Sequence, residues 1–376
     1  MANNNENKIL NVPHLRFPEF TGEWESFKLT ELGKFIGGGT PSSSNLSFWA
    51  GSIPWISSSD IKEDSINNIS ISRYITEEAI EKSTTKYCPA PVILIVSRVG
   101  VGKVALSYTS LCTSQDFCNI IEIKCHPVFL SYNLLRTMKR KSREVQGTSI
   151  KGITSDELQK IRVFIPQDKD EQNKISNILT LLDERIATQN KIIDKFQSLI
   201  KGLAVALTTK GKPNTAISQC LECHSSALQE SEVMPNGLYK VFGANGLVGY
   251  TDVPQMNGDA ILVIKDGSGV GTVSYAQGKF SVIGTLNYLT VIGNNDLRYL
   301  YFALSVFNFQ PYKTGMAIPH IYFKDYGKAK IYCPSLAEQK RVANVLDKLE
   351  SKLFVEQELL ASFNQQKLYL LGKMFI

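Results

Sequence analysis

The sequence predicts an α+β protein with two related domains, each followed by a long helix, and with the two helices pairing antiparallel within one chain in pseudo-two-fold symmetry. Three observations predict this fold. They are an internal repeat, two long helical patterns, and a stretch of short β-like runs and turn signals before each helix. The chain of 376 residues, 43% of them hydrophobic, is long enough to build two separate cores.

The chain repeats itself once. Residues 146–166 (QGTSIKGITSDELQKIRVFIP) align with residues 314–334 (TGMAIPHIYFKDYGKAKIYCP). Upstream, residues 96–106 resemble residues 264–275, because both consist of an apolar run, a glycine turn and a second apolar run. These matches share a shift of about 168 residues, so we interpret the chain as a duplicated unit.

A long helical pattern follows each copy of the repeat, with apolar residues at the period of about 3.5 residues that is typical of a coiled-coil seam. The predicted seam contains Ile175, Leu179, Leu182, Ile186, Gln189, Ile193, Phe196, Ile200 and Leu203 in the first helix, and Val342, Leu346, Leu349, Leu353, Glu356, Leu360, Phe363, Lys367 and Leu370 in the second. In an antiparallel pair in register, Gln189 and Glu356 meet at the middle layer, and such a polar layer fixes register. The alternative is a dimerisation coiled coil between two chains. Pairing within the chain is favoured because both copies lie in one polypeptide.

Capping-box patterns mark the two helix starts. They are Asp168-x-x-Glu171 and Ser335-x-x-Glu338, in which the glutamate is expected to bond back to the helix N-terminus. The predicted organisation is a polar N-terminal segment (1–20), a first domain (21–167), a first helix (168–207), a second domain (208–334) and a second helix (335–376).

Short apolar runs predict strands within both domains. They are residues 53–57, 92–96, 119–123 and 162–165 in the first domain, and residues 260–264, 271–275, 288–292 and 329–332 in the second. A helix is expected near residues 130–143, with a looser counterpart at residues 297–306.

Composition and termini limit the class of protein. The net charge of +6, from 41 basic and 35 acidic residues, is compatible with a polyanionic partner without requiring one. The polar N-terminus lacks the apolar core of a secretory signal, and we find no apolar run of about 18 residues, so a cytoplasmic protein is expected. Its seven cysteines are then expected to be reduced thiols.

Several motif-like strings fail as catalytic or cofactor sites. The C-x-x-C-H string that begins at Cys220 lacks further zinc ligands, and covalent haem attachment would need an exported protein. The glycine turns at residues 100–102 and 267–271 lack the spacing of nucleotide-binding loops, and the chain has no Pro-Pro pair of the kind found in DNA amino-methyltransferases. We therefore expect no catalytic residue, no metal and no cofactor in this chain.

Polar and basic side chains on loops between strands remain as candidate functional groups. Arg and Lys contact phosphates or guanine edges, and Asn and Gln bridge adenine edges. The candidate DNA-contacting residues are Ser57, Ser58, Ser59, Asp60, Arg98, Lys103, Gln115, Thr148, Ser149 and Lys151 in the first domain, and Lys265, Ser268, Thr285, Asn287, Lys313, His320 and Lys324 in the second.

The order of these motifs resembles that of a type I restriction-modification specificity subunit. The first half carries GGGTP at residues 37–41, GSIPW at 51–55, a glycine turn, and then Glu171-Gln172 and Leu182-Asp183. The second half carries YKVFGANGLVGY at residues 239–250, another glycine turn, and then Glu338-Gln339 and Leu346-Asp347. The resemblance covers nearly the whole chain.

The resemblance implies that each domain is a target-recognition domain that reads one half of a bipartite, asymmetric site in double-stranded DNA. The helices would act as a spacer and as a docking surface for methyltransferase subunits, which nuclease-translocase subunits join. S-adenosylmethionine, ATP and Mg would act only in those partners. One departure is that residues 208–230 show no counterpart of residues 37–55, which predicts a shorter second domain.

Two other functions are compatible with the same residues. One is a freestanding DNA-binding repressor, and the other is a duplicated coiled-coil adaptor that binds protein or carbohydrate. Co-purification with methyltransferase chains would favour the specificity subunit, whereas binding that is indifferent to DNA sequence would favour the adaptor.

Overall fold

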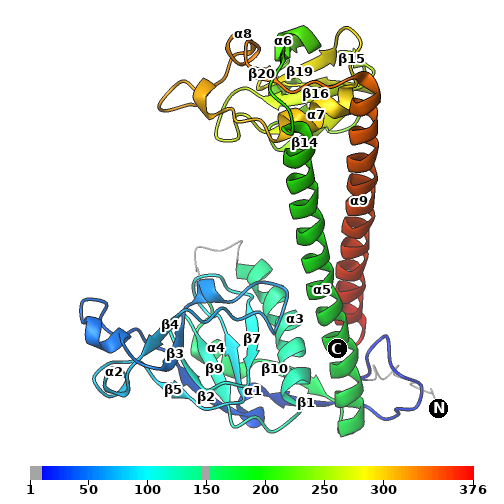
Figure 1. Ribbon diagram of the computed structural model, residues 1–376. Helices are drawn as coiled ribbons and strands as arrows, with labels where there is room; N and C mark the ends of the chain where they lie inside the picture. The colour runs from blue at the N-terminus through cyan, green and yellow to red at the C-terminus, as the bar shows by residue number, and fades with distance from the viewer. Residues whose placement is uncertain (1–10, 146–151) are drawn as a thin grey trace, which may run out of the picture. The chain divides into compact units, whose positions relative to one another are not determined.

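The computed structural model describes residues 11–145 and 152–376, and it divides into two compact units (Figure 1). The first unit consists of Met1–Thr188 with Leu360–Ile376, and the second of Gln189–Leu359. The long helices are α5 (Lys169–Thr208) and α9 (Leu336–Lys373). Each unit therefore combines one globular part with a section of both long helices. In the described part of the chain, no helix is both long and apolar enough to cross a membrane.

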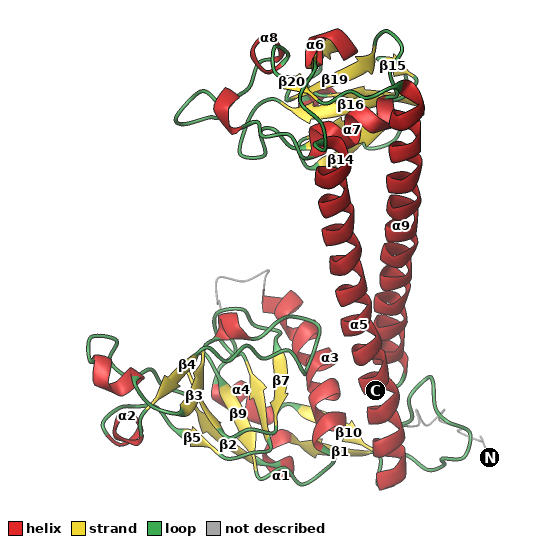
Figure 2. Ribbon diagram, viewed as in Figure 1, coloured by secondary structure: helices red, strands yellow, loops and turns green. Residues whose placement is uncertain are grey.

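The globular part of the first unit is built on three small sheets (Figure 2). Its elements are β1 (Glu25–Lys28), α1 (Leu29–Leu32), β2 (Lys34–Gly37), β3 (Ile53–Ile56), β4 (Arg73–Ile75), α2 (Glu77–Glu81), β5 (Tyr87–Cys88), β6 (Val92–Ile95), β7 (Val104–Ser107), β8 (Leu111–Thr113), β9 (Cys118–Ile121), α3 (Pro127–Val145), α4 (Ser155–Lys160) and β10 (Arg162–Ile165). The strand orders are β2-β9-β6-β7, β4-β3-β8-β5 and β1-β10, and β3 pairs with β8 in parallel.

The second unit repeats this arrangement strand by strand. Its elements are β11 (Thr215–Ala216), α6 (Ile217–Cys220), β12 (Leu221–Ser225), β13 (Tyr239–Gly243), β14 (Gly246–Thr251), β15 (Met256–Asn257), β16 (Ala260–Ile264), β17 (Val273–Ala276), β18 (Lys279–Val282), β19 (Leu286–Val291), α7 (Leu297–Ser305), α8 (Phe323–Tyr326) and β20 (Lys330–Ile331). The strand orders are β12-β19-β16-β17, β14-β13-β18-β15 and β11-β20, and β13 pairs with β18 in parallel. The predicted α+β duplication is confirmed, and each of the eight predicted strands coincides with an observed one.

The second domain is shorter, as predicted, since its strands span residues 215–331 whereas those of the first span residues 25–165, but residues 37–55 do have a counterpart. Because β11, α6 and β12 correspond to β1, α1 and β2, the counterpart of residues 37–55 lies at residues 225–243 rather than 208–230. Its sequence differs while its strands are retained. In Gln189–Leu359, which is described throughout, the α-helix of the first globular part that has no equivalent is α2, because β14 runs on to β15 without a helix.

The core of the first globular part extends onto both long helices. Trp24, Phe129 of α3 and Phe375 pack edge to face or tilted, with ring centroids 5.2 to 6.4 Å apart. Ile175 of α5 and Leu371 of α9 are buried in the same cluster. Full burial of each such side chain is worth about 1.5–3 kcal/mol. Both helices are therefore held by the domain as well as by each other.

The second core uses the opposite ends of the same helices. Ala204, near the end of α5, and Val342 and Leu346, near the start of α9, pack with Tyr299 and Phe302 of α7. In each unit, the domain core thus receives the start of one long helix and the end of the other.

The helices α5 and α9 lie side by side and antiparallel within each unit (Figure 1). The predicted pairing within one chain is confirmed. In the second unit, Gln189 Nε2 donates to Glu356 Oε2 at 2.5 Å and to the Glu356 carbonyl at 3.0 Å. In the first unit, the buried Lys367 ammonium pairs with the Asp183 carboxylate. All seam residues predicted from the 3.5-residue period are buried or half-buried.

The capping boxes form only in part. Asp168 accepts from the Asp170 N–H at 2.8 Å, and Ser335 accepts from the Glu338 N–H at 3.4 Å, as N-cap residues do. The glutamates do not bond back to the N-cap as predicted. Glu171 instead accepts two hydrogen bonds from Arg16 and one from Trp24 Nε1. A buried carboxylate needs a charged partner, which the helix N-terminus alone does not supply.

Candidate nucleic-acid interface

In the first unit, several predicted contact residues lie on turns that are bonded to one another. The turn between β6 and β7 is fixed at Ser97, whose N–H donates to the Asp116 carbonyl at 2.8 Å and whose carbonyl accepts from the Ile153 N–H at 2.7 Å. Lys103, at the other end of that turn, donates to the Ser58 carbonyl at 3.1 Å. We call residues 57–60, 96–103, 114–117 and 152–153 the first loop cluster.

The second unit has an equivalent set of turns. The Lys265 N–H donates to the Thr285 carbonyl at 3.0 Å, and the Lys265 carbonyl accepts from the Ile321 N–H at 2.9 Å. The Gly267 N–H donates to the Pro319 carbonyl at 2.9 Å. These bonds join residues 265–272, 283–285 and 314–324, which we call the second loop cluster. Lys265 makes the same two backbone bonds here as Ser97 makes in the first unit.

The glycines of these turns are required by the backbone. Gly100 and Gly102 have φ of 86° and 111°, and Gly271 has φ of 89°, a region that favours glycine. The GGGTP motif has a different reason. A Cβ on Gly38 would lie 2.0 Å from the Ser114 carbonyl oxygen, so the chain can cross the first loop cluster only without a side chain there.

Within the first loop cluster, the side chains differ in availability. Arg98 is exposed, whereas the Lys103 ammonium is engaged by the Ser58 carbonyl. Gln115 is exposed and accepts a hydrogen bond from Thr40 Oγ1 at 2.5 Å. Three other predicted contacts, Thr148, Ser149 and Lys151, lie outside the described residues.

Asp60 is paired within the protein by a residue that sequence reasoning missed. Arg73 of β4 donates to Asp60 and, at 2.7 Å, to Ser57 Oγ, and its guanidinium lies 4.6 Å from the centroid of the Trp55 ring. The Arg73 guanidinium thus compensates the negative charge of Asp60, which weakens its repulsion toward phosphates. No local pattern signals this pair, because β4 meets the turn only through strand pairing with β3.

Within the second loop cluster, Ser268 and Lys324 are exposed, and Lys313 and His320 are half-buried. The Thr314 and His320 backbones exchange two hydrogen bonds of 2.9 and 2.8 Å, which close a small loop. Its tip carries Met316 and Ile318 with 105% and 67% of their surfaces exposed. Apolar side chains of this kind suit contact with thymine methyl groups or base steps, and the sequence-based site did not include them.

Three further predicted contacts in the second unit are buried or half-buried. Asn287 is only 5% exposed and accepts from Ser225 Oγ at 3.1 Å, so it cannot reach a ligand from this position. Lys265 is half-buried beside Cys223. Burial raises the pKa of the Cys223 thiol to about 11, and the Lys265 ammonium acts against that rise. Thr285 is also half-buried, and its hydroxyl oxygen is enclosed.

The C-x-x-C-H residues do not converge. Cys220 Sγ lies 3.6 Å from Cys333 Sγ, and His224 Nε2 lies 2.9 Å from Thr290 Oγ1 while its ring stacks on Tyr288. In residues 11–145 and 152–376, no group of three His, Cys, Asp or Glu side chains is placed to hold a metal.

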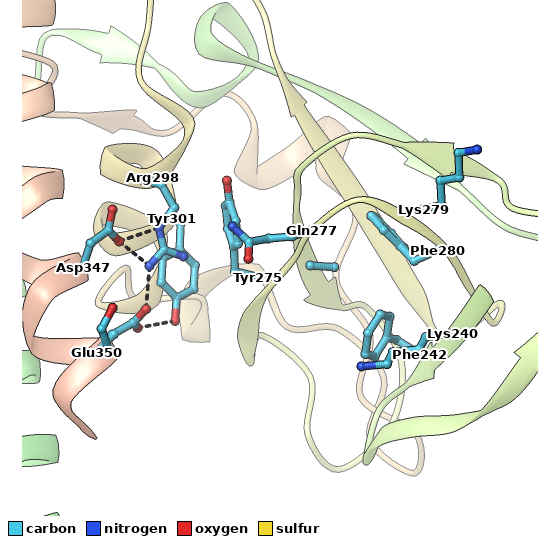
Figure 3. A pocket seen from close by; sticks show the side chains of 12 residues that line it. Lys240, Phe242, Tyr275, Gln277, Lys279, Phe280, Arg298, Tyr301, Asp347 and Glu350 are labelled. Carbon is cyan, nitrogen blue, oxygen red and sulfur yellow. Dashed lines mark hydrogen bonds and ion pairs between the residues drawn. The ribbon is translucent and has the colours of Figure 1, made fainter. Parts of the chain in front are cut away.

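The second unit also contains an open cavity of about 760 Å³ (Figure 3). Arg298 lines it and donates to Asp347 and Glu350, each at 2.6 Å, and its guanidinium lies over the Tyr275 and Tyr301 rings. Burial acts against the charge, but the two carboxylates outweigh it and raise the pKa of Arg298. The Arg298 charge is compensated by two carboxylates of α9, so this ion-pair group holds α7 against α9 rather than binding an anion.

Comparison with known proteins identifies the fold and the family. A family model described as the type I restriction modification DNA specificity domain matches residues 21–197 and 223–365. The type I restriction enzyme MjaIX specificity subunit of Methanocaldococcus jannaschii is 32% identical over 183 residues, which is 46% of this chain and 41% of that protein. The EcoR124I/EcoR124II specificity subunit of Escherichia coli is 35% identical over 177 residues, which is 45% of this chain and 43% of that protein.

Those two alignments thus span less than half of each relative's length. A solved structure matches more completely. The crystal structure of a type I restriction-modification system S subunit from M. genitalium has a TM-score of 0.65 with 18% identity, and the match covers 97% of this chain and 99% of that one. At this identity the likeness concerns the fold, which is shared over nearly the full length.

Proposed function

Because the chain belongs to the family of type I restriction-modification specificity proteins, with a DNA specificity domain matched in each half, we propose that it selects the DNA target for a type I complex. Each loop cluster reads one half of a bipartite site in double-stranded DNA. The chain itself carries out no reaction. Methyl transfer from S-adenosylmethionine and ATP- and Mg-dependent cleavage take place in partner subunits.

The observation that carries the proposal is the duplication of the loop clusters. Ser97 and Lys265 make the same pair of backbone bonds in two domains of the same topology, yet the exposed side chains around them differ. Arg98 and Gln115 are exposed in the first loop cluster, and Ser268 and Lys324 are exposed in the second. The two loop clusters share a backbone arrangement but differ in their exposed side chains. Because side chains read DNA sequence at base edges, this favours a DNA target with two different halves.

The partners follow from the same family. We propose that methyltransferase subunits bind this chain and that nuclease-translocase subunits join the complex. Joint engagement of two half-sites raises affinity only if the connector spans the distance between them, and a pair of long helices is a connector of fixed length.

Methylome sequencing tests the proposal. The chain is expressed with the methyltransferase subunits of its host, in cells that lack the nuclease subunit, and the methylated motifs are compared with those of cells without the chain. A new motif of two different halves at a fixed spacing is expected. A methylated motif that is the same with and without the chain would contradict the proposal.

A further inference from the structure

One glutamine makes the same contacts at the same place in both units. Gln172 Nε2 donates to the Pro166 carbonyl at 2.8 Å, and its Oε1 accepts from the His126 N–H at 3.0 Å. Gln339 Nε2 donates to the Pro334 carbonyl at 2.9 Å, and its Oε1 accepts from the Asp296 N–H at 2.9 Å. Each amide thus donates to the proline carbonyl and accepts from the backbone N–H, and Gln339 Nε2 also donates to Asn295 Oδ1 at 3.2 Å.

The partners of these glutamines are equivalent positions of the two domains. His126 directly precedes α3 and Asp296 directly precedes α7, so each accepted bond comes from the start of a domain helix. Each proline lies between the last strand of the domain and the long helix, Pro166 between β10 and α5 and Pro334 between β20 and α9. One side chain therefore ties together the domain helix, the exit from the last strand and the long helix. We call this arrangement the glutamine clamp.

The chemistry of the clamp requires glutamine. Gln172 and Gln339 are 5% and 2% exposed, and a buried amide that loses a partner costs about 1–3 kcal/mol. An ionised glutamate in either place could accept but not donate, and it would face a carbonyl oxygen. A leucine would leave the carbonyl and the N–H without a partner.

The preceding glutamates do not share this role. Glu171 is fully buried and bonded to Arg16 and Trp24, whereas Glu338 is bonded to Lys210 and Arg341 near the surface. The glutamine is therefore the member of each Glu-Gln pair whose contacts are common to both copies.

From this duplication we propose that Gln172 and Gln339 are positioning residues, each of which fixes the direction in which a target-recognition domain leaves its long helix. The inference rests on the proposed function. A reader with two separated patches selects the spacing of its half-sites only if each patch is held rigidly on the connector. The glutamine clamps thus determine how strictly the complex selects half-site spacing, while the loop clusters determine the bases.

The test uses Gln172→Glu and Gln339→Glu in the full chain assembled with its methyltransferase subunits. Gln197→Glu on α5 and Gln357→Glu on α9 are matched controls, since they introduce the same charge on exposed positions of the same helices. Methylome sequencing of the wild type gives the motif. Methylation rates are then measured on duplexes with the native spacing and with spacings one base pair shorter or longer.

We expect each clamp variant to retain the half-site sequences and to lose about tenfold in its preference for the native spacing, which corresponds to one buried hydrogen bond. The controls should keep the wild-type preference. If the glutamates prevent folding, as judged by thermal unfolding, Gln172→Asn and Gln339→Asn retain donor and acceptor with a shorter reach and are measured in the same way.

Two results overturn the inference, and they are distinguishable. A wild-type motif without two spaced halves overturns the proposed function and the inference with it. A bipartite wild-type motif whose spacing preference is unchanged in the folded clamp variants overturns the inference alone.

Discussion

At the scale of single residues, the buried ion pair of the first unit is the contact whose disruption should cost the most stability. Lys367 and Asp183 have side chains that are 6% and 7% exposed, and Lys367 also donates to the Asp64 carbonyl. Tyr132 Oη donates to the other Asp183 oxygen at 2.9 Å. Removal of one partner of such a pair leaves a buried charge without compensation.

Lys367→Met should therefore lower the free energy of unfolding of the first unit by about 3–5 kcal/mol. The double variant Lys367→Met/Asp183→Asn should recover part of the loss, because the second change removes the stranded charge. Calorimetric unfolding of the full chain measures both, and Lys348→Met, at an exposed position of α9, is the control. An unchanged transition in Lys367→Met would show that the pair does not stabilise the unit.

Glu338 provides a pH-dependent contribution in the second unit. Hydrogen bonds from Arg341 and then Lys210 lower the pKa of its carboxyl from 4.5 to about 2. A carboxyl whose pKa is depressed on folding stabilises the protein above its unfolded pKa and loses this effect as pH falls through the folded pKa. The stabilisation should thus be present above pH 4.5 and disappear between pH 4.5 and 2.

The matching experiment compares wild type and Glu338→Gln by unfolding across that pH range. The difference in stability between them should shrink as the pH falls. It should be small throughout, because exposed ion pairs are weak. A difference that grows toward acid pH would contradict the assignment.

At the scale of elements, the sequence predicted best what depends on periodicity. The seam of the helices follows from the 3.5-residue period, and Gln189 and Glu356 were placed opposite each other because both copies could be counted from their own starts. The partners of Glu171 could not be predicted, because Arg16 lies 155 residues away in the chain. Likewise, Asn287 was predicted as a DNA-contacting group because the sequence does not reveal that its side chain is buried and bonded to Ser225 of the neighbouring strand β12.

The polar layer at Gln189 and Glu356 should fix the register of the helix pair. The Glu356 carboxylate also receives a hydrogen bond from Lys352, which together with Gln189 lowers the pKa of Glu356. Replacing both residues by Leu should make the layer apolar and permit other registers or self-association. Analytical ultracentrifugation of Gln189→Leu/Glu356→Leu measures the oligomeric state. A monomer with an unchanged DNA spacing preference would show that the layer is not needed.

At the scale of the whole molecule, the two units share one topology with divergent sequence. The sequences of the two halves can be aligned at the glycine turns and the helices. Residues 225–243 occupy the place of residues 37–55 but no longer resemble them in sequence. Backbone pairing is retained through many substitutions, since strands require only an apolar face toward the core. The candidate site was therefore predicted only as a set of turns, and which side chains face outward required the structure.

The length of the long helices should set the spacing between the two half-sites. Insertion of four residues, about one helical turn, between Gln189 and Ile193 should change the spacing between the half-sites and leave their sequences intact. Methylome sequencing of the insertion variant measures both quantities in one experiment. An unchanged spacing would mean that the connector does not set it.

The central claim is that each domain reads its own half of the target. The most direct test is methylome sequencing of two variants, Arg98→Ala in the first loop cluster and Lys324→Ala in the second. Each contact to a base edge is worth about 1–3 kcal/mol of discrimination. We predict that each variant relaxes recognition within one half-site, that the two variants affect different halves, and that the spacing stays constant. Relaxation of the same half by both variants, or of both halves by one, would contradict the account.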